Sequence, residues 1–547
     1  MKNQSLPQPE ERRLSGTPAS GGFGAGPLFV QAETANGTVE SALPPYHAGS
    51  TEVEKSALED ALGAASVELS ALLETLNGSE EGIIEFQIAM LEDETVSEAA
   101  FEAVAQGTPA LVAWRSAITT LVNEYRSASD AYFRDRAGDI IDIQTRVEGL
   151  LCGQTADGFP AGSIVVATDV TPTRFLETDW NGGGVALFEG SASSHVAMLA
   201  RARGVPLLVG LERADLQACG EALIDGDLGQ LIVDPSDRSR SEHEHKWRDH
   251  DLRARDDETH LDGPAVTAAG ETVAVYLNVA SSDDLEGIEA GHCDGIGLVR
   301  TEFLFHDDTG LPDEDAQFEA YRTIVEWAEG RPVTFRTLDA GGDKPIAGLT
   351  VDDESNPFLG VRGYRLSLLH PDVFETQLRA LLRVAALGPV KIMVPMITTA
   401  EEFAEARGLF EKTREQLSKE DVEIGEPAFG MMVEVPAAAI AIEEFDAGFF
   451  SIGSNDLIQY VTACGRDNRA VGHLMNPELT AVTFLLERVA THGRDSGREV
   501  SLCGDLAADR RYAHLLLDCG LRALSVAPSA LAACKAEVAT YGGKADG

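Results

Sequence analysis

The C-terminal half of the chain alternates short β-rich runs with helical stretches, and this rhythm constrains the fold more than any other feature. The helical stretches carry apolar residues at three- and four-residue spacing, for example over 313–329 and 476–494. Eight strands that alternate with helices over about 280 residues are typical of a TIM (β/α)8 barrel. We therefore predict a barrel over residues 263–547. The eight predicted strands are 272–278, 295–299, 333–338, 391–395, 430–435, 448–453, 499–503 and 523–527.

The N-terminal half predicts a second α/β domain that a helical block interrupts. Residues 46–153 carry the helical spacing of apolar residues almost throughout, with Gly, Pro and Ser at the joins. An apolar strand at 27–31 precedes this block, so the block is most simply an insertion into one domain made of residues 1–45 and 154–235. Further strands of that domain are predicted at 163–168, 184–188, 206–209, 222–225 and 230–233.

Three other segments lead to less specific predictions. Residues 14–32 are glycine-rich and predict turns before a short strand, because no Lys-Ser or Lys-Thr follows them as in a phosphate-binding loop. Residues 236–262 are polar and predict a linker, in part a solvated helix, that serves as a hinge. The helical block 46–153 has no evident catalytic cluster, which favours a docking surface, with a plain scaffold as the alternative.

One histidine lies at a predicted helix start. Ser194 is a preferred N-cap residue, and Gly204 followed by Pro206 is a common helix ending. His195 therefore falls in the first helical turn, where backbone N–H groups and the helix dipole favour a bound anion such as a phosphoryl group. The alternative interpretation is an ordinary surface histidine near a helix start.

Charged and polar residues cluster directly after the predicted barrel strands, where the active sites of TIM barrels lie. Arginine binds phosphate and carboxylate groups in a bidentate manner, and Glu434 and Asp456 offer the oxygen ligands that suit Mg²⁺. Each charge alone could form a surface ion pair, but their recurrence favours a site for a small phosphorylated acid. With the histidine, such a site implies phosphoryl transfer. The strand-end residues are Arg300, Arg336, Lys344, Arg362, Glu434, Asn455, Asp456, Arg466 and Cys503.

The charge balance limits the partners. The chain has 43 basic and 90 acidic residues and a net charge of −47. Such an acidic surface argues against nucleic acid or an anionic membrane as a partner. It indicates adaptation to a high-salt cytoplasm, with an acidic protein of an ordinary cytosol as the alternative. Scattered cysteines without a CxxC pair, no bilayer-length apolar run and no signal-peptide pattern predict a cytoplasmic protein without membrane insertion.

Several motifs of the chain together resemble Enzyme I of the phosphoenolpyruvate-dependent sugar phosphotransferase system. The resemblance covers nearly the whole chain in order, including the inserted helical block. The motifs that carry it are Gly190…Ser194-His195…Ala200-Arg201, GIGLVRTEFLF at 295–305, RTLDAGGDK at 336–344, NPFLGVR at 356–362, MVEVPAA at 432–438, FSIGSNDLIQY at 450–460 and LCG at 502–504.

The resemblance implies a swivelling phosphohistidine domain with His195 phosphorylated on Nε2, and a helical block that docks the carrier protein HPr. It implies that phosphoenolpyruvate donates the phosphoryl group in the first step of sugar uptake, and that Cys503, a thiol beside cations, protonates the enolate to pyruvate. It also implies a homodimer through the barrel. By the same resemblance Glu434 and Asp456 bind Mg²⁺, and phosphoenolpyruvate is held by Arg300, Arg336, Asn455, Asp456 and Arg466, with support from Lys344 and Arg362.

The chain departs from the pattern of that family at a few positions. Ser191 and Ser193 stand where the family usually has Gly and Thr, and Gly465 replaces an acidic residue common before Arg466. The chain stops soon after the eighth predicted strand, which weakens the expectation of a dimer.

Two other functions compete with this interpretation. A pyruvate phosphate dikinase or phosphoenolpyruvate synthase relative would need an ATP-binding domain, and no nucleotide motif precedes Glu189. A non-catalytic module that only binds phosphoenolpyruvate or partners would not need His195, Glu434, Asp456 and Cys503 together.

Overall fold

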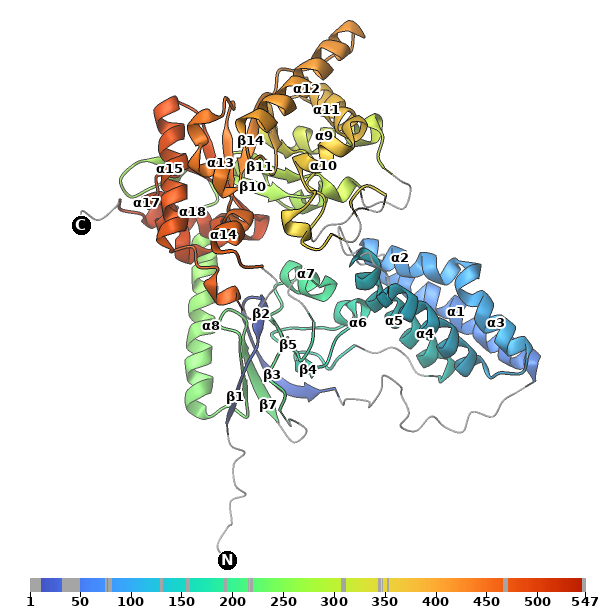
Figure 1. Ribbon diagram of the computed structural model, residues 1–547. Coiled ribbons are helices and arrows are strands. Elements are labelled where there is room, and N and C mark those ends of the chain that lie inside the picture. Colours follow the sequence, from blue (N-terminus) through green and yellow to red (C-terminus); the bar gives the residue numbers. More distant parts are fainter. Residues whose placement is uncertain are drawn as a thin grey trace, which may run out of the picture. The chain divides into compact units, whose positions relative to one another are not determined.

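A computed structural model describes most of the chain. The chain divides into two compact units, residues 1–251 and residues 252–547, whose elements are labelled in Figure 1. The predicted fold class, a multidomain α/β chain with an inserted helical bundle followed by a TIM barrel, is confirmed. The described residues are 11–31, 50–73, 76, 81–127, 131–153, 158–190, 194–214, 216, 220–305, 311–342, 346, 348–351, 354–465 and 471–543.

One sheet organises the N-terminal unit. Its strands are β1 (Arg12–Ser15), β2 (Thr17–Ser20), β3 (Phe23–Val30), β4 (Ile164–Ala167), β5 (Gly184–Leu187), β6 (Leu207–Val209), β7 (Glu221–Asp225) and β8 (Gln230–Val233). They lie in the order β1-β8-β7-β3-β4-β5-β6-β2. β3 pairs antiparallel with β7 through its first residues and parallel with β4 through its last. β4, β5 and β6 continue in parallel.

The prediction of turns before the strand at 27–31 is wrong, because β1, β2 and the start of β3 run through residues 14–26, whereas the strand itself is confirmed as the end of β3. β1 and β2 pair through their backbones with β8 and β6, so they need no apolar run. The glycines allow close backbone packing: a Cβ on Gly24 or Gly26 would collide with the carbonyl of Gly183 or Gly162.

A block of helices is inserted between β3 and β4. Its described helices are α1 (Thr51–Leu73), α2 (Glu81–Glu92), α3 (Glu94–Ala105), α4 (Ala110–Ser127) and α5 (Ala131–Leu151). Leu58 and Trp114 are fully buried between them. Glu54 of α1 accepts a hydrogen bond of 2.8 Å from the N–H of Ala110, which satisfies a donor at the start of α4. The same hydrophobic cluster reaches Val165 of the sheet, so the block and the sheet share one core.

The N-terminal unit also carries α6 (Pro172–Leu176), α7 (His195–Ala202) and most of α8 (Asp237–Glu258). α8 occupies most of the segment 236–262, for which a polar linker that is in part a solvated helix is predicted, so the helix extends further than expected. Lys246 of α8 pairs with Asp225 of β7 at 3.1 Å. The boundary between the two units falls within α8, and Asp257, already in the C-terminal unit, pairs with Arg510 at 2.5 Å.

The C-terminal unit is a closed barrel of parallel strands. Its strands are β10 (Thr272–Val279), β11 (Ile296–Arg300), β12 (Val333–Arg336), β13 (Val390–Val394), β14 (Ala428–Val433), β15 (Phe450–Gly453), β16 (Val500–Cys503) and β17 (Ala523–Val526). β10 pairs with both β11 and β17, which closes the barrel. The short β9 (Ala265–Val266) lies antiparallel beside β10. Each predicted run overlaps one of the barrel strands, so the prediction of a TIM barrel is confirmed.

Helices follow most of the barrel strands, as Figure 1 shows. Phe335, Ile392 and Phe450 belong to a hydrophobic core that the strands and these helices share. Among the described residues, no helix combines the length and apolar content that crossing a membrane requires. The helices are α9 (Glu314–Trp327), α10 (Tyr364–Leu369), α11 (Pro371–Val384), α12 (Ala400–Lys419), α13 (Pro436–Ile440), α14 (Ser454–Thr462), α15 (Thr480–Ser496), α16 (Asp505–Ala508), α17 (Ala513–Asp518) and α18 (Leu531–Thr540).

Candidate active site

Five of the predicted site residues lie at the C-terminal ends of the barrel strands. Arg300 is the last residue of β11, Arg336 the last of β12 and Cys503 the last of β16. Glu434 directly follows β14, and Asp456 lies in the first turn of α14, which follows β15. Because the parallel strands of a barrel end at one rim, these residues share one mouth of the barrel.

Arginines and carboxylates form a buried ion-pair network at this mouth. Arg336 donates from Nη2 to Glu302 Oε1 at 2.9 Å and pairs through Nη1 with Asp339 Oδ2 at 3.0 Å. Arg362 bridges Asp339 and Asp456 at 2.9 and 3.1 Å. All five residues are buried. Charge-assisted hydrogen bonds are strong away from water, so the network holds both guanidinium groups in place.

Glu434 adds another buried carboxylate to the mouth. Its Oε1 accepts a hydrogen bond of 2.7 Å from the N–H of Met396, and a Cβ on Gly453 would lie 2.8 Å from its Oε2. Burial, together with the charges of Asp456 and Asp339, raises the pKa of Glu434 to about 8. Glu434 is therefore mostly protonated at neutral pH in the protein alone, and a bound divalent cation would favour its ionised form.

These donors fit Mg²⁺ that also binds water and substrate oxygens. Among the residues that the structure describes, no group of three or more His, Cys, Asp and Glu side chains is arranged to hold a metal ion. Mg²⁺ does not need such a cage, since it commonly uses one or two carboxylates together with waters and substrate phosphates. Glu434 and Asp456 match that donor set, and Gly453 leaves space beside the Glu434 carboxylate.

Two arginine N–H groups at the mouth point to an anionic ligand. Arg300 Nε and Arg336 Nε are buried and have no hydrogen-bond partner among the described residues. Buried donors without a partner are uncommon and destabilising, so they indicate a ligand that is absent from the protein alone. The guanidinium of Arg300 also lies over the ring of Phe303, 5.5 Å from its centroid. Both arginines are thus available to bind phosphate or carboxylate oxygens.

Cys503 lies in apolar surroundings beneath the charged groups. It belongs to a hydrophobic cluster with Leu298 and Met432, and Ser451 Oγ donates a hydrogen bond to its Sγ at 3.7 Å. Burial raises the pKa of Cys503 to about 11, although the bond from Ser451 and the charge of Arg336 act in the opposite direction. The thiol is therefore protonated at neutral pH, and burial keeps it protonated well above the pH at which a free thiol ionises.

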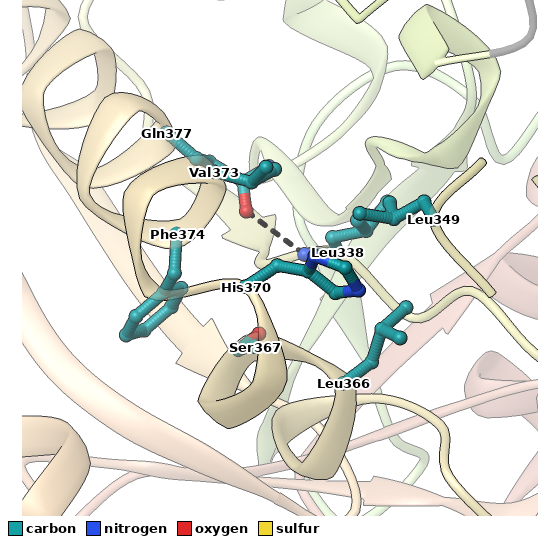
Figure 2. Close-up of a pocket in the computed structure, with 8 residues that line it drawn as sticks. All are labelled: Leu338, Leu349, Leu366, Ser367, His370, Val373, Phe374 and Gln377. Atoms are coloured by element: carbon teal, nitrogen blue, oxygen red, sulfur yellow. Dashed lines mark hydrogen bonds between the residues drawn. The ribbon is translucent and has the colours of Figure 1, made fainter. Parts of the chain in front are cut away.

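Gln377 of α11 holds the segments that follow two barrel strands. Its Oε1 accepts a hydrogen bond of 2.9 Å from the N–H of Leu338, and its Nε2 donates to Thr301 Oγ1 at 3.0 Å. Thr301 follows Arg300 and Leu338 precedes Asp339, so Gln377 helps to position both charged residues. Figure 2 shows the bond to Leu338 at a small pocket whose lining contains no predicted site residue: Leu338, Leu349, Leu366, Ser367, His370, Val373, Phe374 and Gln377.

Three predicted substrate-binding residues do not join the described network. Lys344 and Arg466 lie outside the described residues. Asn455 Nδ2 donates to Asp505 Oδ2 at 3.1 Å, and the N–H of Asp505 donates back to Asn455 Oδ1 at 3.1 Å. The side chain of Asn455 is therefore bonded to the start of α16 rather than to the arginines.

Sequence reasoning gave no role to three residues that hold the arginines. Glu302 and Asp339 pair with Arg336, and the Tyr460 hydroxyl accepts a hydrogen bond of 3.4 Å from Arg362 Nη1. Their positions in the sequence could have indicated a role, because each of the three residues lies within a motif that follows a barrel strand. Asp339 pairs with Arg336 within one segment, whereas the contacts of Glu302 and Tyr460 depend on distances between segments that follow different strands.

The predicted helix with His195 in its first turn is present as α7. Ser194 is its N-cap and accepts a hydrogen bond of 3.3 Å from the N–H of Ala197. Gly204, with φ +63°, lies just beyond the end of the helix. The imidazole of His195 and the segment 191–193 lie outside the described part of the structure.

Comparison with known families identifies the class of protein that this fold and site define. Residues 15–136 match the family described as PEP-utilising enzyme, N-terminal. Residues 159–229 match PEP-utilising enzyme, mobile domain, and residues 254–542 match PEP-utilising enzyme, PEP-binding domain. The chain therefore has the three parts of a PEP-utilising enzyme.

Individual relatives narrow this class. The phosphoenolpyruvate-protein phosphotransferase of Enterococcus faecalis is 34% identical over 499 residues, covering 88% of this chain and 87% of the relative. The proteins of that name from Bacillus subtilis and Haloferax volcanii are 34% and 36% identical over 508 and 497 residues. The match to the Bacillus subtilis protein covers 89% of this chain and 88% of that protein. The match to the Haloferax volcanii protein covers 88% of this chain and 86% of that protein. The chain belongs to the phosphoenolpyruvate-protein phosphotransferase family of enzymes, which the likeness supports over the dikinase alternative.

Proposed function

We propose that the chain transfers the phosphoryl group of phosphoenolpyruvate through His195 to the histidine of the carrier protein HPr and releases pyruvate. Membership of the phosphotransferase family supports the reaction as a whole. The buried arginines at the barrel mouth carry the assignment of the donor site, because Arg300 Nε and Arg336 Nε have no partner among the described residues. Phosphoenolpyruvate offers both a phosphate and a carboxylate to such donors.

The residues of the mouth would bind and orient phosphoenolpyruvate rather than react with it covalently. Phosphoryl transfer proceeds through a loose transition state, so positioning and charge neutralisation supply most of the catalysis. Arg300 and Arg336 would hold the ligand oxygens, and Arg362, held by Asp339 and Asp456, would keep the network rigid. Lys344, Asn455 and Arg466 are proposed as further ligands on the resemblance alone.

Mg²⁺ is the proposed cofactor, with Glu434 and Asp456 as its protein ligands. A bound Mg²⁺ would neutralise charge on the substrate oxygens during transfer. The two buried carboxyl groups at the ends of neighbouring strands, with Gly453 in place of a larger residue beside Glu434, support this assignment.

Two side chains, His195 and Cys503, would take part in the steps that form phosphohistidine and pyruvate. His195 Nε2 would form a bond to phosphorus while the bond from phosphorus to the enol oxygen breaks, which leaves its electron pair on the enolate. Cys503 would then give its proton to the enolate carbon, and water would return a proton to the thiolate. The high pKa of the buried Cys503 thiol supports this role, since the proton is present at neutral pH.

The remaining proposals concern partners and location. The helical block of α1 to α5 is the proposed docking site for HPr, and the barrel is the proposed dimer interface. A cytoplasmic location agrees with the absence, among the described residues, of a helix suited to cross a membrane.

The reaction is tested by incubating the protein with phosphoenolpyruvate labelled on phosphorus, with Mg²⁺, and then with HPr. We expect label on His195, its passage to HPr and one pyruvate for each phosphoryl group transferred. His195→Ala should abolish labelling, and Arg300→Gln should raise the KM for phosphoenolpyruvate while leaving the melting temperature near that of the parent. Labelling that requires ATP, or that persists in His195→Ala, would contradict the proposal.

A further inference from the structure

The short helix α6 lies between α5 of the helical block and α7, and its first turn is bonded to the block. Asp142 of α5 accepts hydrogen bonds from both the N–H and the hydroxyl of Thr173, the former at 3.0 Å. Gln87 of α2 donates to the same carboxylate oxygen at 3.3 Å. All three residues are buried. Directional bonds therefore fasten the N-terminal end of α6 to the helical block.

The other end of α6 is fastened by an ion pair. Glu177 is the C-cap residue of α6, and Arg146, one turn beyond Asp142 on α5, donates to its Oε1 at 2.5 Å. Arg146 also donates to Glu68 Oε2 of α1 at 2.7 Å, and its side chain is only 4% exposed. Removing Arg146 would leave Glu177 partly buried without this partner, which is strongly unfavourable. The two fastened ends fix both the position and the rotation of α6 on the block.

α6 in turn packs against α7. Arg203, the C-cap residue of α7, donates from Nη1 to the carbonyl of Leu176 at 3.2 Å. Phe175 and Leu176 of α6 share one hydrophobic cluster with Val196 and Leu199 of α7. The helical block thus reaches α7 through α6 by an unbroken series of contacts.

We propose that Asp142, Arg146, Thr173 and Glu177 form a clamp that sets the position of α7 relative to the helical block for transfer to the carrier. The inference rests on the proposed function, in which HPr docks on the block and receives the phosphoryl group from His195 at the start of α7. These four are positioning residues, since they act through α6 and α7. Transfer depends steeply on the placement of the reacting groups, so a small shift of α7 would slow it.

The clamp predicts a difference between the two half-reactions. Transfer to HPr needs α7 and the helical block in a fixed arrangement. Transfer from phosphoenolpyruvate to His195 involves the barrel instead, and no clamp residue belongs to it. Loss of the clamp should therefore slow the second half-reaction far more than the first.

Arg146→Met tests the clamp in the full chain, because it removes the bonds to Glu177 and Glu68 while keeping an apolar stem. Arg146→Lys is the rescue variant, since it keeps the charge. Arg115→Met is the matched control: Arg115 of α4 pairs with Glu148 of α5 at 2.6 Å, within the helical block. This pair joins α4 to α5, so the variant disturbs α5 and leaves the four clamp residues unchanged.

Labelled phosphoenolpyruvate and HPr separate the two half-reactions. We expect Arg146→Met to lower kcat/KM for HPr by roughly 10- to 100-fold and to leave the rate of His195 labelling within about twofold. Arg146→Lys should restore most of the loss, and Arg115→Met should change neither rate. Amide hydrogen exchange over residues 196–203 should speed up in Arg146→Met and not in Arg115→Met. This exchange readout does not depend on activity.

Thr173→Val provides a second test if Arg146→Met does not fold. It removes the hydrogen bond from the hydroxyl to Asp142, keeps the bond from the N–H and barely changes the side-chain volume. It should therefore slow transfer to HPr more than the labelling of His195, by a smaller factor than Arg146→Met. The clamp would be overturned if Arg146→Met slowed both half-reactions equally or slowed neither. It would also be overturned if Arg115→Met slowed transfer to HPr as much as Arg146→Met does. A failure of the proposed function would instead appear in the unmodified chain, as absence of label on His195, and would remove the basis for the inference.

Discussion

Cys503 shows how the surroundings of one side chain decide what it can do. A free thiol ionises near pH 9, whereas burial raises the pKa of Cys503 to about 11. Its neighbours Leu298 and Met432 keep water away from the sulfur, so the thiolate is disfavoured and the proton is retained. The residue is thereby suited to give a proton to a strongly basic enolate and unsuited to act as a nucleophile.

The pH dependence of pyruvate formation tests this assignment. Because the pKa of Cys503 is raised, the thiol proton should remain available through pH 9 and be lost only as the pH approaches 11. Cys503→Ser should slow pyruvate formation by about 100-fold or more while His195 is still labelled from phosphoenolpyruvate. Continuous pyruvate assays across this pH range provide the measurement. A fall in the parent rate centred near pH 9 would contradict a buried, protonated donor.

Gly504 offers a second test at the scale of one residue. It has φ +104°, and a Cβ there would lie 2.8 Å from Asn455 Oδ1 and closer still to Ser454 Oγ. Gly504→Ala should therefore displace Asn455 and raise the KM for phosphoenolpyruvate by about tenfold. Gly497, with φ +67° and no atom within 4 Å of such a Cβ, is the matched control. Gly497→Ala should cost about 1 kcal/mol of stability with an unchanged KM.

At the residue scale, the sequence predicted which residues lie at the site better than it predicted which of them form ion pairs with one another. Arg336 and Glu434 were found because polar residues directly after barrel strands stand out against the apolar runs. The pairing of Arg336 with Glu302 joins the ends of two different strands, β12 and β11, and needs the folded distances. Likewise, the identity of Cys503 indicated a reactive thiol, but its burial, which raises its pKa to about 11, is visible only in the structure.

Among the elements, α7 combines a structural cap with a start suited to an anion. The Ser194 hydroxyl accepts the bond from Ala197 that caps the helix. The remaining free N–H groups of the first turn favour negative charge nearby. These two contributions of residue 194 can be separated by substitution.

We expect Ser194→Ala to lower the free energy of unfolding by about 1 kcal/mol, because it removes the cap. Ser194→Asp should retain the cap, since Asp is an equally good N-cap residue. Its carboxylate would repel the incoming phosphoryl group, so His195 labelling should slow at unchanged stability. Urea unfolding and labelling rates measure the two effects. Labelling of Ser194→Asp at the parent rate would argue against an anion site at this helix start.

Helices and strands could be predicted from the sequence where their buried positions are all apolar. The barrel strands are buried on both faces, so each appears in the sequence as a short apolar run between helices. α8 is different: it is a 22-residue helix whose buried positions include the polar residues Ser239 and His243. Its polar composition therefore predicted only a linker with some helix, and not a helix of this length. β1 and β2 escaped prediction because backbone pairing, not apolar side chains, defines them.

For the whole molecule, the net charge of −47 dominates the long-range electrostatics. Repulsion among like charges favours expansion of the chain, and salt weakens it by reducing the screening length from ~30 Å at 0.01 M to ~3 Å at 1 M. We expect the melting temperature to rise as KCl increases over this range. Thermal unfolding followed by circular dichroism provides the measurement. An unchanged melting temperature would contradict adaptation to high salt.

The separation of β3 from β4 along the chain delays completion of the N-terminal sheet during synthesis. Leu28 of β3 pairs with Ile164, and Arg12 of β1 pairs with Val233, so both pairings wait for distant residues to leave the ribosome. The helices inserted between β3 and β4 contact near neighbours in sequence, and local contacts form first. We therefore expect the helical block to form while β1 is still an unpaired edge. The exposed charges of Arg12 and Arg13 protect that nascent edge against aggregation until β8 arrives.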